Sequence, residues 1–261
     1  MALQASELKG LKIGSVEWFS QQRALLKSKP LLKYCYDFWY QTQLQDEASV
    51  PKQSQGIVLE LGSGASYLKE IRPDVITSDV TPGAAEMVID ARKLPFSDGS
   101  VRAILLTHVF HHIPDVELFL KEADRVLVPG GVISMIEVAH TPFARFFFSN
   151  FHHEPYDDRA KDWAFNQTHA MNDSNQALAW NVLFRDRARF EQFHPSLKLR
   201  GPSYLPWFTY LLSGGVTRKA LIPMFATPLA IVIEKLVSPL SPLFSIHWHL
   251  CLEKSIPSPK T

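Results

Sequence analysis

VLELGSGAS, residues 58–66, places two glycines directly after an apolar strand and directly before the start of a helix. Gly62 suits a tight turn with positive φ, and Gly64 allows a ligand to approach backbone that a Cβ would shield. A GxG pair is only a weak indication of a ligand, because the same turn also connects strands to helices without one. The stretch therefore predicts a strand, a tight turn and a helix at the head of an α/β core.

Short apolar segments bounded by turn residues alternate with helical segments after this loop. The expected strands cover residues 57–61, 75–80, 87–91, 101–107 and 132–138. Asp115 can cap the helix before the last of these strands, and Pro129-Gly130-Gly131 is expected to end that helix. Such alternation is typical of a parallel sheet with crossover helices, so the sequence predicts a doubly wound fold.

Helices and two late strands are expected on either side of this core. A helix should run from Ser15 to Lys27, a second should begin at Pro30, and the polar residues 41–55 should connect it to the sheet. The C-terminal part is expected to hold a helix over 175–193, strands over 197–199 and 246–252, and an unusually long connection over 206–243. Pro223 and Pro228 should split that connection into short helices, none long enough to cross a membrane.

The composition narrows the class of protein. Of 261 residues, 46% are apolar and 20% are charged, which is enough to bury a full core. The 27 Lys and Arg residues against 26 Asp and Glu residues leave a net charge of +1, which disfavours a nucleic-acid partner. Cys35 and Cys251 have no disulfide or metal-binding spacing. No secretion signal and no apolar stretch of roughly 20 residues is present, so we expect a cytoplasmic protein.

Three carboxylates accompany the glycine loop. Asp79 ends the second strand, where an acid can hold both hydroxyls of a ribose, and Asp90 follows the third strand, where it can contact an adenine edge. Either acid could instead cap a helix. Glu60 lies inside an apolar strand, where a carboxylate is costly unless it is paired, and a cationic ligand would provide the partner. Tyr67 replaces the third glycine of the dinucleotide fingerprint, which disfavours a nicotinamide cofactor.

Together these motifs resemble those of the class I S-adenosylmethionine-dependent methyltransferases. The resemblance covers roughly residues 56–138 and rests on 60–64, Asp79, Asp90-Ala91, Leu94-Pro95-Phe96, 105–113 and 122–131. Ser66, in place of a frequent third glycine, and Arg102, in place of a common Asp, depart from the family pattern. The resemblance implies a Rossmann-like, doubly wound α/β sheet of seven strands, mostly parallel with an antiparallel last strand, plus N-terminal helices and helical insertions.

The same resemblance implies S-adenosylmethionine as the cofactor and assigns it a set of binding residues. These are Glu60, Gly62, Ser63, Gly64, Asp79, Val80, Asp90, Ala91, Thr107 and His108. Methyl transfer is an in-line displacement in which the enzyme mainly holds the methyl acceptor close to the methyl carbon. An aliphatic hydroxyl acceptor also benefits from a base, because its own pKa is high.

Candidates for that base follow the fourth and fifth strands, since ligands of open α/β sheets bind beyond the carboxyl ends of the strands. They are His111, His112, His153 and Glu154. The histidine pair could instead pack the strand-to-helix turn. A metal is not expected, because the spacings HVFHH and HHE match no zinc template.

A further group of residues is expected to contact the methyl acceptor. It consists of Glu137, Trp180, Arg185, Arg187 and Tyr210. Residues 153–155, 175–187 and 210–215 resemble a subgroup of bacterial methyltransferases associated with surface-polysaccharide assembly. Glu137 could instead bond neighbouring backbone, and the two arginines could form an ion-pair cluster with Asp186 rather than clamp a phosphate.

The apolar segment 206–243 has alternative roles. With Trp180 and Phe146–Phe148 it could close a pocket for a lipid-linked acceptor, or it could rest on a membrane surface. It could also pack against the sheet edge or another subunit. The sequence does not predict the oligomeric state.

We expect a single methyltransferase domain over residues 1–261. Its parts are an N-terminal helical segment (1–50), a cofactor-binding core (56–138), an acceptor-side segment (139–195), and the last two strands (196–254) with the insertion 206–243. The favoured function is methyl transfer to a small or carrier-linked metabolite, preferably a glycan or lipid-linked sugar hydroxyl, at most in peripheral contact with the inner membrane face. The alternative is a cofactor-binding or scaffolding protein without catalysis.

Overall fold

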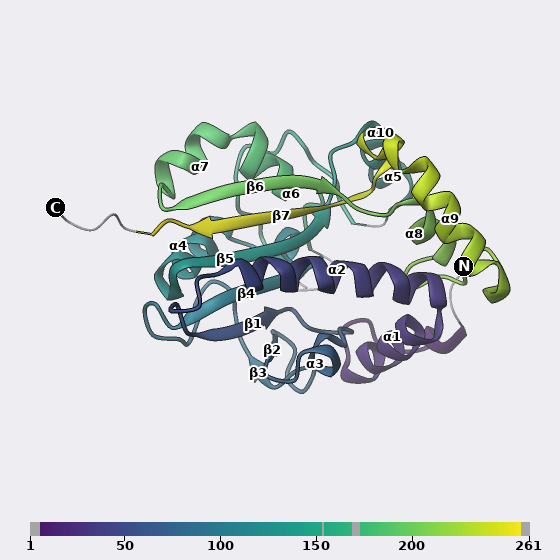
Figure 1. Cartoon of the computed structure of the whole chain (residues 1–261), viewed down its shortest axis with the longest axis horizontal. Helices are drawn as coiled ribbons and strands as arrows, with labels where there is room; N and C mark the ends of the chain where they lie inside the picture. Colours follow the sequence, from purple (N-terminus) through teal and green to yellow (C-terminus); the bar gives the residue numbers. More distant parts are fainter. Residues whose placement is uncertain (1–5, 153, 169–172, 257–261) are drawn as a thin grey trace.

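A seven-stranded sheet runs through the middle of the protein, in the order β3-β2-β1-β4-β5-β7-β6 (Figure 1). The computed structural model describes residues 6–152, 154–168 and 173–256. The strands are β1 Ile57–Leu61, β2 Ile76–Asp79, β3 Met87–Val88, β4 Val101–Thr107, β5 Leu127–Val138, β6 Leu197–Tyr204 and β7 His247–Lys254. β1 to β5 pair in parallel, and β7 pairs antiparallel with β5 and β6. This confirms the predicted Rossmann-like, doubly wound sheet with an antiparallel last strand.

Helices cover both faces of the sheet. They are α1 Val16–Ser28, α2 Pro30–Ser49, α3 Leu68–Ile71, α4 Val116–Val126, α5 Pro142–Phe151, α6 Leu178–Trp180, α7 Arg187–Phe193, α8 Phe208–Ser213, α9 Thr227–Val237 and α10 Ser241–Phe244. Single helical turns occur at Ser6–Leu8, Phe110–His112, Met224–Ala226 and Ser238–Leu240, and a π-helical turn at Asn181–Arg185. α2 lies along one face, whereas α4 and α7 cover the other (Figure 1).

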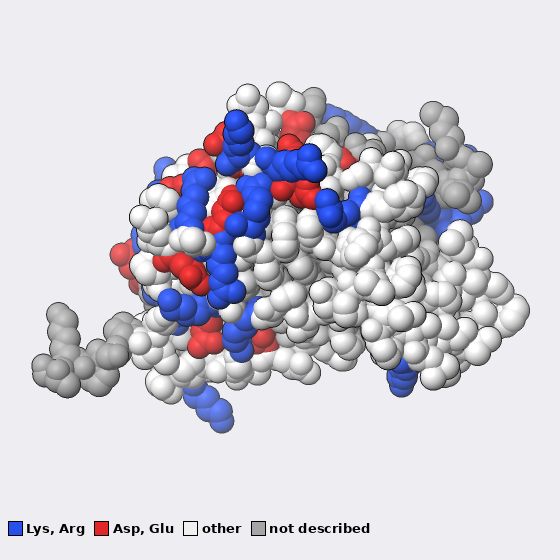
Figure 2. All heavy atoms as spheres, turned by 90° about the horizontal axis from the view of Figure 1, so that it is seen from above, with Lys and Arg blue, Asp and Glu red and all other residues white. Residues whose placement is uncertain are grey.

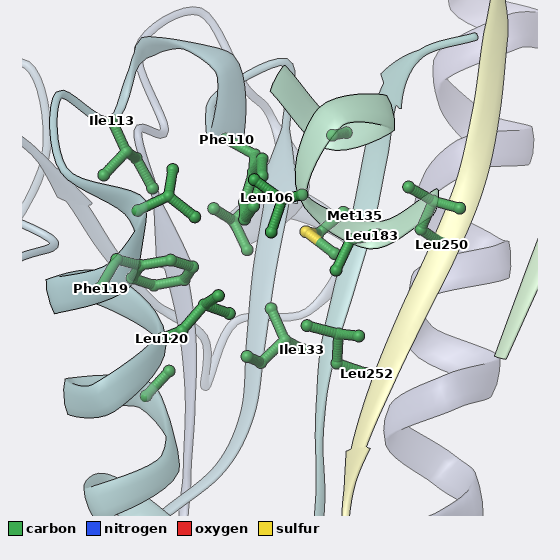
Figure 3. Packing of buried hydrophobic residues seen from close by; sticks show 14 of the residues in the cluster. Leu106, Phe110, Ile113, Phe119, Leu120, Ile133, Met135, Leu183, Leu250 and Leu252 are labelled. Atoms are coloured by element: carbon green, nitrogen blue, oxygen red, sulfur yellow. The ribbon is translucent and has the colours of Figure 1, made fainter. Parts of the chain in front are cut away.

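Successive residues of the central strands face opposite layers. In β4, Ile104 and Leu106 pack in the same cluster as Phe119 of α4, whereas Ala103 and Leu105 belong to the cluster beneath α2. Figure 3 shows the α4 layer, where side chains from β4, β5 and β7 meet those of the helix. Because both faces of these strands are buried, the core holds their carboxyl ends, and the loops that follow them, in place.

α2 is longer than the sequence predicts. It continues to Ser49 through residues that we expected to form a connection. Its polar side chains are buried against the sheet with partners: Gln43 Nε2 donates to the carbonyls of Leu106 (2.9 Å) and Ser134 (3.1 Å). The prediction was wrong for 41–49, where Gln43 and Glu47 are buried and face the sheet, whereas residues 50–55 do form the predicted connection.

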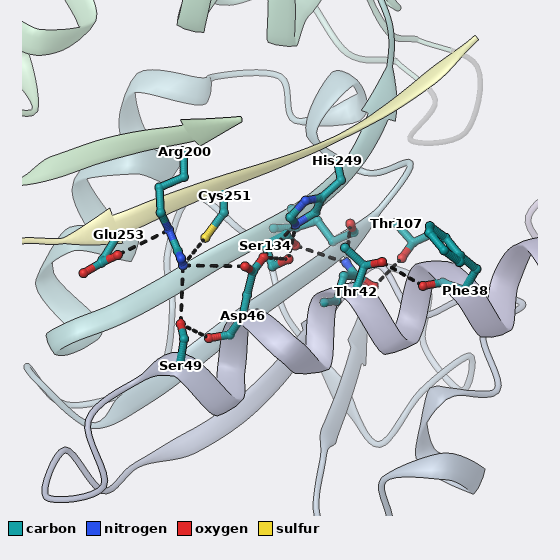
Figure 4. Close-up of polar contacts among 12 residues, drawn as sticks. Phe38, Thr42, Asp46, Ser49, Thr107, Ser134, Arg200, His249, Cys251 and Glu253 are labelled. Atoms are coloured by element: carbon teal, nitrogen blue, oxygen red, sulfur yellow. Dashed lines mark hydrogen bonds and ion pairs between the residues drawn. The ribbon is translucent and has the colours of Figure 1, made fainter. Parts of the chain in front are cut away.

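Two ion-pair groups fasten this helix to the sheet. Asp46 Oδ2 accepts hydrogen bonds from Ser134 Oγ and His249 Nε2, each at 2.6 Å (Figure 4). Glu47 pairs with Arg102 at 2.5 Å and with Arg72 at 2.9 Å. Arg102 also donates to four backbone carbonyls, those of residues 47, 50, 51 and 54. Arg102, which stands where the resembled family commonly has an Asp, therefore anchors the end of α2.

Other predicted boundaries also moved. The helix expected over 175–193 is interrupted, because Asp186 leaves the helical conformation and accepts hydrogen bonds from Trp163 Nε1 (2.9 Å) and Arg185 Nη2 (2.6 Å). α4 ends at Val126, before Pro129-Gly130-Gly131, and these three residues belong to β5. Gly214 and Gly215 end α8 in a turn, with φ of 71° and 59°.

The structure of the insertion 206–243 differs from the prediction of short helices that are too short to cross a membrane. Helical turns continue without a break from Met224 to Phe244, 21 residues that by length and composition could cross a membrane, and only 17% of its most apolar window is buried. Pro228, Pro239 and Pro242 each lie at the start of a helical segment, where a missing N–H costs little. Pro228 therefore does not split the segment as predicted, whereas Pro223 lies directly before the helical run.

Candidate active site

A cavity of about 690 Å³ opens at the carboxyl ends of β1, β2, β4 and β5. It extends from the glycine loop to α5 and α8. All of the predicted cofactor-binding residues line it, namely Glu60, Gly62, Ser63, Gly64, Asp79, Val80, Asp90, Ala91, Thr107 and His108. His111, His112, Glu154 and Tyr210 line the same cavity. The strand ends therefore bring the two predicted ligand sites into one space.

The glycine loop is closely packed from behind. Gly62 has φ of 67°, and a Cβ on it would lie 2.5 Å from Cγ2 of Val109. Gly64 has φ of 37°, and its Cβ would lie 2.9 Å from Cε1 of Phe19 in α1. Both positions therefore require glycine, and α1 covers this end of the cavity.

Glu60 lies on the cavity wall with an unsatisfied oxygen. Glu60 is 2% exposed, and no group of the described residues forms a hydrogen bond with its Oε2. Burial raises the pKa of Glu60 to about 7. A buried carboxylate oxygen without a partner fits a cationic group of a ligand.

The two predicted aspartates are held differently. Asp79 is buried and accepts hydrogen bonds from the backbone N–H groups of Gly64 (3.1 Å) and Thr81 (2.8 Å). Asp90 is more exposed and forms a bidentate pair with Arg92, which lowers the pKa of Asp90. Asp79 thus links the end of β2 to the glycine loop, whereas Asp90 lies at the rim.

Four ionisable side chains meet at the other end of the cavity. His111 Nδ1 lies 2.5 Å from Glu137 Oε2, and Glu154 Oε2 lies 3.9 Å from His111 Nε2 and 3.7 Å from His112 Nε2. Burial opposes protonation of His111, but the charge and the hydrogen bond of Glu137, together with the charge of Glu154, outweigh it and raise the pKa of His111. His153, the other predicted base, lies outside the described residues.

Glu137 has a different role from the predicted contact with the methyl acceptor. It is fully buried and does not line the cavity. Its Oε1 accepts hydrogen bonds from the backbone N–H groups of Val109 (3.0 Å) and Phe110 (2.8 Å), while Oε2 holds His111. Glu137 is therefore a positioning residue for His111 and for the turn that carries it.

Three more of the predicted acceptor-contacting residues lie outside the cavity lining. Trp180 stacks on His140 at 3.8 Å, Arg185 pairs with Asp186 at 2.6 Å, and Arg187 pairs with Glu191 at 2.8 Å. The arginines form local ion pairs, as the alternative interpretation held. Phe147 and Phe148 line the cavity, but Phe146 does not and is 57% exposed.

Sequence reasoning missed His247 at the start of β7. Its ring lies 4.5 Å from that of His108 and 4.5 Å from that of Tyr210, on the cavity wall. Ile246, Trp248 and Leu250 alternate along this segment and pack in the hydrophobic core. The opposite face, which carries His247, was the signal that could have found it.

Comparisons with known proteins agree with this geometry. Residues 59–135 match the family described as a methyltransferase domain. The chain is 28% identical over 135 residues to demethylmenaquinone methyltransferase of Thermus thermophilus, a match covering 44% of this chain and 61% of that protein. It is 37% identical over 51 residues to norajmaline N-methyltransferase of Rauvolfia serpentina, covering 20% and 18%. The chain thus spans less than two thirds of either relative.

Solved structures share the fold at low sequence identity. Geranyl diphosphate C-methyltransferase of Streptomyces coelicolor, in complex with Mg²⁺, geranyl diphosphate and S-adenosyl-L-homocysteine, has a TM-score of 0.51 at 13% identity, covering 97% of this chain and 89% of that one. A methyltransferase of Thermotoga maritima, described as a possible histamine N-methyltransferase, has a TM-score of 0.50 at 15% identity, covering 91% and 100%.

Proposed function

We propose that the chain is a class I S-adenosylmethionine-dependent methyltransferase and that it transfers the methyl group of this cofactor to a small-molecule acceptor. The observation that carries the proposal is the single cavity that joins the glycine loop to the His111–Glu154 end. When bound, the cofactor supplies a methyl group activated by its sulfonium charge. Glu60, with its unpartnered oxygen, fits the cationic part of that cofactor, and Asp79 fits its ribose.

We propose that the acceptor atom is a hydroxyl oxygen. An amine needs little beyond correct placement, whereas a hydroxyl must lose a proton as the new bond forms. Buried ionisable groups are costly unless they are paired, and here four of them gather at the end of the cavity opposite the glycine loop. His111, His112 and Glu154 are the groups that would meet the acceptor hydroxyl.

The body of the acceptor should be apolar in part. Phe147, Phe148 and Phe151 of α5 and Leu211 of α8 line the acceptor end of the cavity. Leu221 also lines the cavity, is 60% exposed and precedes the surface of residues 224–244 in the chain. A lipid-linked sugar, with a polar head and an apolar tail, matches both the ionisable cluster and these walls.

The same surface supports peripheral membrane contact at the cytoplasmic face. Phe225 (86%), Leu236 (74%) and Met224 (68%) are among the most exposed apolar side chains. Glu234 is buried and accepts hydrogen bonds from Thr209, so it does not place a charge on this surface. On the face seen in Figure 2, charged side chains gather over one half, while the half toward α9 and α10 carries few of them. Such an apolar surface fits the lipid that would carry the acceptor.

Methyl transfer from labelled S-adenosylmethionine tests the function. A lipid-linked sugar should be methylated faster than the same sugar without its lipid, and a primary amine of similar size should not be methylated. Cofactor binding without transfer to any hydroxyl acceptor would favour the scaffolding alternative.

Flotation with vesicles of phosphatidylethanolamine and phosphatidylglycerol tests the membrane contact. The double variant Phe225→Asp, Leu236→Asp should lose most of the binding. Leu118→Asp is the matched control, because Leu118 is 45% exposed but lies on α4. Equal flotation of both variants would rule out the surface of residues 224–244 as the contact.

A further inference from the structure

His111, His112 and Glu154 form a cluster whose geometry the proposed function does not explain. One ligand atom from each lies within 4.8 Å of the others. The two Nε2 atoms face the same Glu154 oxygen, at 3.9 Å and 3.7 Å. These separations exceed a hydrogen bond, but they suit ligands that share an ion, because zinc lies about 2.0–2.2 Å from each nitrogen or oxygen ligand. We propose that the three side chains bind a divalent transition-metal ion.

The opposite ring nitrogens support this assignment. His111 Nδ1 faces Glu137 Oε2 at 2.5 Å, and His112 Nδ1 faces the carbonyl oxygen of Asp173 at 3.4 Å. A carbonyl oxygen accepts hydrogen bonds only, and so does an ionised carboxylate, so each Nδ1 carries the proton. In the neutral imidazoles each Nε2 then carries the lone pair, on the side of the ring that faces Glu154. Histidines that bind metals are held in the same way, by an acceptor on the second ring nitrogen.

The carboxylate is also held in position. Glu154 Oε2 accepts hydrogen bonds from Ser174 Oγ at 3.1 Å and from Gln176 Nε2. All three proposed ligands therefore have supporting partners that fix their direction before an ion binds.

The donor set selects the class of metal. Two imidazoles and one carboxylate suit Zn²⁺, Fe²⁺, Mn²⁺ or Co²⁺, whereas Mg²⁺ and Ca²⁺ prefer oxygen ligands. Three protein ligands leave at least one coordination position open, and the ligands line the cavity. An oxygen of the acceptor can occupy that position, and an ion lowers the pKa of a hydroxyl bound to it. This role in activating the hydroxyl rests on the proposed function, but binding of the ion does not.

The sequence spacing argued against a metal because zinc templates are local. Glu154 follows the histidine pair only after β5 and α5, and the turn after β4 meets the segment after α5 at the cavity. The ligand set is therefore visible only in the folded chain.

Titration of the metal-free protein with Co²⁺ tests the site without any methyl acceptor. One Co²⁺ per chain should bind and give visible absorption of a low-coordinate nitrogen and oxygen site, and Zn²⁺ should displace it. Glu154→Gln and His112→Ala should each weaken binding at least tenfold, and Glu137→Gln by roughly tenfold to a hundredfold through His111. His140→Ala is the matched control, because His140 lies outside the cavity lining.

Thermal unfolding of each variant, measured in parallel, identifies any variant that fails to fold. The other of the two ligand variants, Glu154→Gln or His112→Ala, then tests whether the site binds the ion. Absence of stoichiometric Co²⁺ binding, or equal affinity in the ligand variants and His140→Ala, would overturn the site. Methyl transfer that persists after chelation would remove the metal's role and leave the proposed function intact. Metal binding without methyl transfer would support the metal site and overturn the proposed function.

Discussion

The two ends of the cavity are built in different ways. The cofactor end takes most of its residues from positions 60–91, at or just after the ends of β1 to β3, and adds Thr107 and His108 from the end of β4. The acceptor end combines His111, Glu154, Tyr210 and His247, which come from four separate segments. The first end depends on local strand-and-turn geometry, whereas the second depends on long-range packing. A substitution should therefore affect either cofactor affinity or turnover, according to the end in which it lies.

The two ends also differ in how their buried carboxylates are satisfied. Glu60 has an oxygen without a partner, while Glu137 accepts from two backbone N–H groups and holds His111. The cofactor end therefore gains a partner when its ligand binds. The acceptor end is already organised in the free protein.

The largest effect is expected at the acceptor end. His111→Ala should lower kcat by roughly 10² to 10⁴, because the group that meets the acceptor hydroxyl is lost, while cofactor affinity is unchanged. Steady-state kinetics and calorimetry measure the two quantities. Arg187→Ala is the control and should leave kcat unchanged, since Arg187 pairs with Glu191 outside the cavity lining. Equal losses in both variants would contradict the division into two ends.

The next effect concerns the glycine loop. Gly62→Ala should weaken cofactor binding at least tenfold, because its Cβ would lie 2.5 Å from Val109 and displace the loop. Gly99→Ala is the control, since Gly99 has a similar φ of 60° but its Cβ would meet nothing within 4 Å. Both variants should lose about 1 kcal/mol or more of stability from the strained φ. Calorimetry should find the affinity loss in Gly62→Ala alone.

Asp79 tests whether the cofactor end holds a ribose. Asp79→Asn should weaken cofactor binding by about 1–3 kcal/mol, because a charged hydrogen-bond acceptor is lost. Asp98→Asn is the control, as Asp98 pairs with Arg125 at the surface. Saturable binding of a nicotinamide cofactor by the unaltered protein would instead reject the assignment of S-adenosylmethionine.

The smallest effect is a pH dependence from Glu60. Because burial raises its pKa to about 7, the carboxyl is mostly protonated at pH 6 and mostly ionised at pH 8. Affinity for the cationic cofactor should rise roughly fivefold to tenfold over this range, and Glu60→Gln should remove the rise.

The stability of the cofactor-free protein should change in the opposite direction. The folded state binds the Glu60 proton more tightly than the unfolded state, so this contribution to stability is full at low pH. It is lost as the pH rises from the usual Glu range through about 7. Thermal unfolding at several pH values, with Glu60→Gln as the reference, measures this difference. A stability of the unaltered protein that rises over the same range relative to Glu60→Gln would show that Glu60 is ionised at all these pH values.

The sequence by itself determined the cofactor half of this protein. Apolar strands followed at once by Gly62, Asp79 and Asp90 predicted both the sheet and the cavity residues, because parallel strands place their carboxyl ends at one edge. Periodicity also predicted a strand over 246–252, whereas its antiparallel direction was implied by the family resemblance, and His247 was missed. These features depend on neighbours in the chain, so they can be inferred from short patterns.

Only the tertiary structure decided the rest. Polar residues such as Gln43 and Asp46 belong to a helix because their hydrogen-bond partners lie in distant strands. Pro228, Pro239 and Pro242 do not interrupt the helical run 224–244, because each lies at the first turn of a helical segment. The convergence of His112 with Glu154, and the removal of Trp180 and Arg187 from the cavity, follow from how β5, α5 and α6 pack. Long-range contacts of this kind are set by burial and pairing in three dimensions, for which sequence spacing holds no signal.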